Sequence, residues 1–262
     1  MTKFSSLLAV LLLMLVSFTA NSQDYPRGDV SQDGNVSISD VTCLIDYLLS
    51  GTWPDEPVTP PDDHEWVDLG LPSGTLWATC NVGANAPEEY GDYFAWGETE
   101  PKDHYDWSTY KWCNGSYNTL TKYCTDSSYG YNGFVDNKDE LDPEDDAAYV
   151  NWGPSWRMPT FYQLSELYQY CSSVLTSING VGGRLFTAPN GNSLFLPAAD
   201  VRSNYRLGGS IYDEGPYGFY WSRTLISDGP INAFILYFCL DDMYSAGDDR
   251  RVGHSVRAVR VP

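Results

Sequence analysis

A proline-rich, acidic stretch over residues 52–63 divides the chain into two parts of very different length. It contains four prolines, Pro54, Pro57, Pro60 and Pro61, and four acidic residues. Because proline stiffens a chain and like charges extend it, we interpret residues 52–63 as a linker. Residues 64–262 are long enough for one substantial core, whereas residues 23–51 can form only a small module.

The first residues are typical of an export signal. Lys3 precedes an apolar run from Leu7 to Val16, and Ala20-Asn21-Ser22 offers small residues at the spacing that a signal peptidase reads. The run is too short for a transmembrane helix, no other stretch approaches about 20 apolar residues, and no cysteine follows closely as a lipid anchor. We predict a signal peptide over residues 1–22, no transmembrane segment, and a secreted, extracellular or cell-surface protein.

Charge excludes some partners. The chain has 35 Asp and Glu against 15 Lys and Arg, a net charge of -20. Because this field repels phosphate backbones and anionic membrane surfaces, we expect no nucleic-acid partner. Acidity alone can indicate disorder, but 42% hydrophobic and 15% aromatic residues supply enough apolar area for a packed core.

Residues 29–40 have the ligand spacing of an EF-hand-type calcium loop. Oxygen-bearing side chains fall at loop positions one, three, five, nine and twelve, Gly34 supplies the sharp turn at six, and position seven offers a backbone carbonyl. Position twelve is Asp, where a longer Glu is usual. A turn that only caps the following helix is the alternative. The predicted Ca²⁺ ligands are Asp29, Ser31, Asp33, Asn35, Ser37 and Asp40.

The loop and the helix expected after it resemble one repeat of a dockerin, the calcium-binding module that docks onto cohesin domains in cellulosomes. The helix has one apolar face and ends at Gly51. A full dockerin has two such repeats, and the positions that often carry a Ser/Thr pair for cohesin contact are Ile38 and Ser39 here. The resemblance implies calcium binding more strongly than a cohesin-like partner. The apolar helix face must pack on another surface.

Two helices are expected in residues 64–262. Asp142 is placed to cap a helix that begins with Pro143 and ends at Gly153. Thr160 and Gln163 form a capping box, and apolar residues follow at helical spacing.

Short strands should make up most of the remaining structure. Asn190-Gly191 predicts a tight hairpin turn between the apolar runs 185–188 and 193–196. Further strands are expected at 220–224, 233–240 and 255–261. We therefore predict an α+β domain with few helices and many short strands, preceded by a small EF-hand-like loop and helix.

A series of motifs identifies a resemblance for this large segment. They are a run from Trp66 to Ala84, then Tyr93–Thr99, Trp156–Thr160, Phe195–Ala199, Tyr220–Ser222 and Gly253–Arg257. Their order over nearly all of residues 64–262 is similar to the Fibrobacter succinogenes major paralogous domain, found in secreted and surface proteins of gut bacteria. The resemblance implies a C-type-lectin-like fold, the broad fold that formylglycine-generating enzymes also use.

Structural roles are expected for two residues of the third motif. Trp156 should be buried, and Arg157 is positioned to pair with Asp145 or Asp146 of the first helix. Six cysteines in an exported chain allow disulfides, and their pairing stays open. We prefer Cys113 with Cys124, because the short loop between them could close without strain. In the alternative interpretation, Cys43, Cys171 and Cys239, each within an apolar run, are buried as small hydrophobic residues.

Catalytic patterns are missing from the sequence. His64, His104 and His254 lack metal-ligand spacing, and there is no nucleophile elbow or phosphate loop. The acid pairs Asp145-Asp146, Asp241-Asp242 and Asp248-Asp249 are interpreted as solvated surface. The nearest match to the sugar-binding loop of C-type lectins, Ala188-Pro189-Asn190, lacks the leading acid, so the ligand-binding residues are unknown.

We therefore expect no enzyme, but a secreted or cell-surface binding or adhesion protein that recognises a glycan or a protein. One alternative is an accessory subunit of a polysaccharide-degrading assembly, recruited through the dockerin-like repeat. Another is an enzyme of the sulfatase-modifying kind, which would need a reactive cysteine in a cleft.

Overall fold

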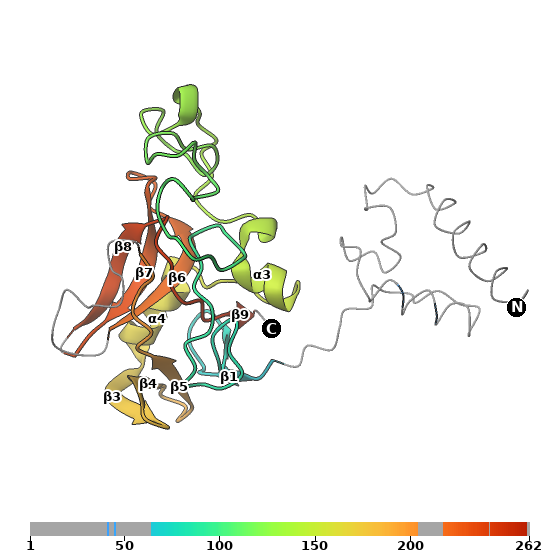
Figure 1. The fold of residues 1–262 in the computed structure, drawn as a ribbon. Coiled ribbons are helices and arrows are strands. Elements are labelled where there is room, and N and C mark those ends of the chain that lie inside the picture. Colours follow the sequence, from blue (N-terminus) through green and yellow to red (C-terminus); the bar gives the residue numbers. More distant parts are fainter. Residues whose placement is uncertain (1–40, 42–44, 46–63, 204–216, 241, 261–262) are drawn as a thin grey trace, which may run out of the picture. The chain divides into compact units, whose positions relative to one another are not determined.

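The computed structural model describes residues 64–203, 217–240 and 242–260, together with Val41 and Ile45. The chain divides into two units, Met1–Asp62 and Asp63–Pro262, and the fold below is that of the second (Figure 1). The predicted signal peptide, calcium loop and linker lie outside the described residues. Within the described ranges, no helix is long and apolar enough to cross a bilayer.

Short antiparallel strands form three sheets in the described part of the chain. The strand orders are β1-β2-β9, β3-β4-β5 and β6-β7-β8. The strands are β1 (Trp66–Asp68), β2 (Leu76–Ala78), β3 (Ser172–Ile178), β4 (Val181–Thr187), β5 (Ser193–Pro197), β6 (Gly218–Leu225), β7 (Asn232–Phe238), β8 (Met243–Asp249) and β9 (Val259–Arg260). This is the α+β architecture of short strands that the sequence predicts.

Two of the three further strands expected from the sequence are present over most of their length, and the third is much shorter. Residues 220–224 lie within β6, and β7 covers most of residues 233–240. In the last expected strand, 255–261, only Val259–Arg260 is regular strand among the residues described. Asn190-Gly191 does connect β4 to β5, but the connection runs from Ala188 to Asn192 and is longer than a two-residue turn.

The first predicted helix begins later than expected. Pro143–Asp145 form a 3₁₀ turn (η2), and helix α3 spans Ala147–Trp152. Asp142 makes no side-chain capping bond, whereas the Asp146 carboxylate accepts hydrogen bonds from the N–H groups of Ala148 and Tyr149. Asp146 is therefore the N-cap. The predicted end at Gly153 is confirmed.

The second predicted helix is confirmed as α4 (Phe161–Tyr170). Thr160 and Gln163 form the reciprocal capping box, which satisfies two N–H groups at the helix start. Leu164 and Leu167 are buried on one face, and α4 packs against β6, β7 and β8. A further 3₁₀ turn, η1, spans Tyr131–Gly133.

Residues from different sequence motifs hold the core together. The indole N–H of Trp96 donates to the carbonyl of Ser222, and that of Trp221 donates to the carbonyl of Phe94, both at 2.8 Å. Trp156 is fully buried, as predicted. Motifs that are far apart in the sequence are therefore bound directly to one another.

Arg257 provides a second connection between motifs. Its Nε–H donates to Asn81 Oδ1 at 2.8 Å, and its guanidinium also donates to the carbonyls of Ala78 and Thr79. The side chain is fully buried, and this burial lowers its pKa to about 10. Arg257 thus joins the end of the described chain to the segment after β2.

Candidate binding surface

Residues 113–137 form a loop that presents aromatic rings to solvent, and we call it the tyrosine lobe. Tyr117, Tyr131 and Phe134 are 49%, 44% and 37% exposed. More than half of the residues in the lobe are Tyr, Ser, Gly or Asn. These four types also dominate antibody binding loops, where Tyr supplies contact area at low entropic cost and the small polar residues supply adaptable hydrogen bonds.

The lobe has internal structure, although it contains no strand longer than a single bridge. Leu120 is fully buried and forms bridges with both Cys113 and Gly130, which brings the two arms of the lobe together. The rings of Tyr117 and Tyr129, one on each arm, lie 6.5 Å apart between centroids. The backbone bridges and the Tyr117–Tyr129 contact therefore give the lobe a defined structure.

The base of the lobe is fixed by a buried tyrosine. The Tyr123 hydroxyl donates to Asp145 Oδ2 at 2.6 Å and accepts from the N–H of Asp142. Burial, together with this bond to Asp145, raises the pKa of Tyr123. The carboxylate of Asp136 accepts from the N–H groups of Tyr123 and Cys124, at 2.8 Å each, and closes the lobe where its arms meet.

Arg250, the residue directly after strand β8, connects that strand to the tyrosine lobe. Its side chain is fully buried and donates to the carbonyls of Lys122, Tyr123 and Pro230. Its Nε–H donates to the hydroxyl of Tyr110, and the guanidinium lies 5.0 Å from the centroid of the Trp96 ring. Carbonyls and aromatic rings, rather than a carboxylate, thus accommodate this buried cation.

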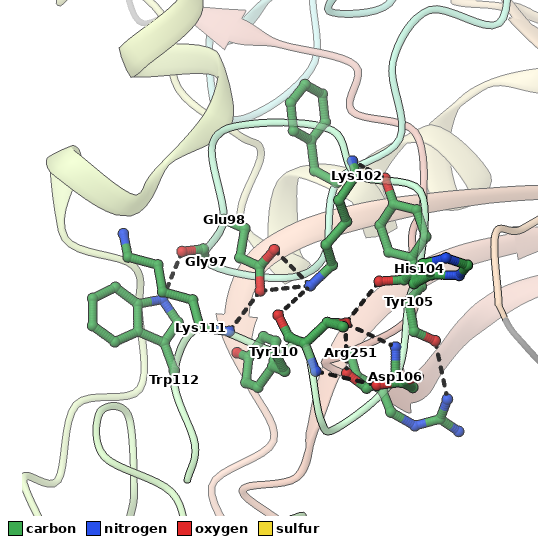
Figure 2. A network of polar contacts seen from close by, with 12 residues as sticks. Gly97, Glu98, Lys102, His104, Tyr105, Asp106, Tyr110, Lys111, Trp112 and Arg251 are labelled. Atoms are coloured by element: carbon green, nitrogen blue, oxygen red, sulfur yellow. Dashed lines mark hydrogen bonds and ion pairs between the residues drawn. The ribbon is translucent and has the colours of Figure 1, made fainter. Parts of the chain in front are cut away.

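Polar contacts also hold the loop that precedes the tyrosine lobe in place (Figure 2). Glu98 is 8% exposed, and its carboxylate accepts from Lys102 Nζ at 2.9 Å and from the N–H of Lys111 at 2.7 Å. The Trp112 indole donates to the carbonyl of Gly97, and Arg251 reaches the carbonyl of Tyr105. The structure therefore places the lobe on a well-bonded support.

The acid pairs differ in how far they match the solvated surface that the sequence suggested. Asp145 and Asp146 are both buried. Asp248 Oδ2 lies 2.9 Å from His254 Nε2, and Asp249 Oδ2 lies 2.9 Å from Arg251 Nη2. Asp241 lies outside the described residues. The interpretation is therefore wrong for Asp145-Asp146, because their tertiary partners are not visible in the sequence. The Asp248 and Asp249 side chains are 31% and 32% exposed, so they are partly solvated as well as paired.

Arg157 does not form the expected ion pair with Asp145 or Asp146. Its Nη1 donates to the carbonyls of Pro154 and Trp156, and its guanidinium lies 4.0 Å from the centroid of the Tyr149 ring. Asp146 instead accepts from the N–H of Met158, in addition to the helix it caps.

The preferred disulfide between Cys113 and Cys124 is absent. Cys80, Cys113, Cys124, Cys171 and Cys239 are all free thiols in the described part of the chain. The sulfur of Cys113 contacts the carbonyl of Trp107, and that of Cys124 contacts the carbonyl of Asp126. Asp136 and Leu120 close the lobe in place of a covalent bond.

The three histidines have different surroundings. His64 stacks on Trp152 at 3.8 Å between centroids, His104 is exposed, and His254 is fully buried between Phe219 and Trp221. Among the described residues, no group of His, Cys, Asp and Glu could hold a metal ion. The six predicted calcium ligands, residues 29–40, lie outside those residues.

The tyrosine lobe is a binding candidate that no sequence motif indicated. The composition of residues 113–137 carried a signal, but from the sequence the aromatic residues were considered as apolar area for a packed core. No family model, curated protein or solved structure matches the chain in the comparisons made.

Proposed function

We propose that this chain is an exported, non-catalytic recognition protein whose C-type-lectin-like domain binds a glycan or a protein through the tyrosine lobe. The N-terminal module would bind Ca²⁺ and carry the domain at the end of its linker. The observation that carries the proposal is the group of exposed rings on a lobe whose base is fixed by Tyr123, Asp136 and Arg250. Binding residues often lie on loops that a rigid scaffold positions.

The stacking chemistry suits both ligand classes. Tyr and Phe rings pack against sugar rings and against apolar side chains, and the neighbouring Asn and Ser side chains can hydrogen-bond to hydroxyls or amides. The overall charge of -20 disfavours strongly anionic ligands.

The test is a binding screen of the chain without its signal peptide against mucin glycans, plant polysaccharides and bacterial surface proteins. Tyr117→Ala and Tyr131→Ala should each weaken the binding found by about tenfold or more, the scale of an interface hot spot. Tyr170→Ala is the matched control, because Tyr170 is also 49% exposed but lies on α4. Equal losses in all three variants, or no binding to any probe, would contradict the proposal.

A further inference from the structure

Strand β3 is an outer strand and, among the described residues, lacks the features that normally prevent strand addition. It pairs with β4 over all seven residues without a register shift, and β4 is its only neighbour in the described sheet. Val174, near its centre, is 57% exposed. Natural proteins protect such edges with charged residues, proline, bulges or covering segments, because the free N–H and C=O groups are a template for another strand.

The other outer strands do carry these features. Asp68 lies in β1, Arg260 in β9, Pro197 ends β5, and Asp248 and Asp249 end β8. The register of β6 shifts between Trp221 and Leu225. In contrast, residues 167–183, which include all of β3, contain no Asp, Glu, Lys or Arg.

This uncharged edge suits one partner in particular, a second copy of the chain. Two copies with a net charge of -20 each repel one another over most of their surfaces. Like charges directly opposite one another destabilise strand pairing, and two copies that meet at β3 avoid them. Among the described contacts, Arg184 is the only charged side chain bonded to β3 itself; it is buried and also donates to the carbonyl of Cys239. The Glu88 carboxylate accepts a hydrogen bond from Asn179, one residue beyond the strand.

We propose that β3 pairs with β3 of a second copy, antiparallel about a two-fold axis, and joins two three-stranded sheets into one of six strands. In a register centred on Leu175, Val174 of one copy lies opposite Thr176 of the other, a favourable pair for β-branched side chains. The β3–β4 hairpin and the tyrosine lobe, drawn in green, lie at opposite ends of the unit (Figure 1). The dimer therefore leaves both lobes accessible, and a repetitive ligand would be bound with avidity.

The test is sedimentation equilibrium of the chain without its signal peptide over a wide range of concentrations. We expect a monomer–dimer equilibrium that Val174→Lys weakens at least tenfold. Val150→Lys is the matched control, because Val150 is an exposed valine (45%) on α3 and should leave the equilibrium unchanged. Thermal unfolding of both variants checks that the fold is intact.

Hydrogen exchange identifies the surface. Amides of residues 172–178 should become more protected as the concentration rises, and this gain should disappear in Val174→Lys. A chain that stays monomeric at every concentration, a dimer equally stable in Val174→Lys, or protection confined to other segments would each overturn the proposal. Ligand binding is not part of the measurement, so its outcome is independent of the function proposed for the lobe.

Discussion

At the scale of single residues, Lys122 shows how the acidic excess is used inside the fold. Its Nζ lies 2.6 Å from Asp145 Oδ2 and 2.7 Å from Asp142 Oδ2. Lys138 Nζ also reaches Asp142, at 2.5 Å. Burial raises the pKa of Asp142, but the hydrogen bonds from both lysines outweigh that effect and hold the pKa below its usual 3.8.

The lowered pKa of Asp142 makes part of the folding stability depend on pH. Because the pKa of Asp142 is lower in the folded chain, its contribution is complete above the usual 3.8 and is lost as the pH falls towards the folded value. Asp142→Asn should lower the free energy of unfolding by up to about 1 kcal/mol at pH 7, and by less at pH 3. Urea unfolding at both pH values measures this. Asp139→Asn is the control, because Asp139 is an exposed acid nearby. A loss of the same size at both pH values in Asp142→Asn would contradict the assignment.

At the scale of elements, the tyrosine lobe depends on Arg250. Replacing this side chain with Met leaves the carbonyls of Tyr123 and Pro230 without the donors that they have in the buried interior. Arg250→Met should therefore lower the free energy of unfolding by about 3–5 kcal/mol, measured by urea unfolding. Proteolysis should also cut the lobe sooner.

Arg223→Met is the control for this effect. Arg223 Nη2 lies 3.2 Å from Glu140 Oε2, and the two side chains are 28% and 45% exposed, so the loss of this ion pair should cost about 1 kcal/mol or less. Similar losses for the two variants would mean that Arg250 does not hold the lobe.

The elements also show which parts of the fold can be predicted from sequence. Helix α4 was predictable because its capping box and apolar face are local features. The start of α3 was not, because Asp146 is fixed partly by the N–H of Met158, twelve positions away. The composition of the lobe was visible, but its support by Arg250 joins residues 127 positions apart in the sequence. Short strands such as β9 depend on pairing with β2 more than on their own pattern.

At the scale of the whole molecule, the net charge separates into internal and outward parts. Asp136, Asp145 and Asp146 hold backbone groups or side chains within the fold. The sequence assigns other acids to the calcium loop, over residues 29–40. If that assignment holds, removing the metal leaves several carboxylates close together without a counter-charge, so the state of the N-terminal module should depend on calcium.

Calorimetry of the whole chain without its signal peptide tests this dependence. We expect one calcium site in residues 29–40, because the loop provides one set of oxygen ligands at EF-hand spacing. Asp33→Ala should abolish the heat of binding, since it removes a carboxylate from position five of the loop. Asp126→Ala removes an exposed acid from the tyrosine lobe and should leave the titration unchanged. Undiminished binding by the Asp33 variant would show that the loop only caps the helix that follows it.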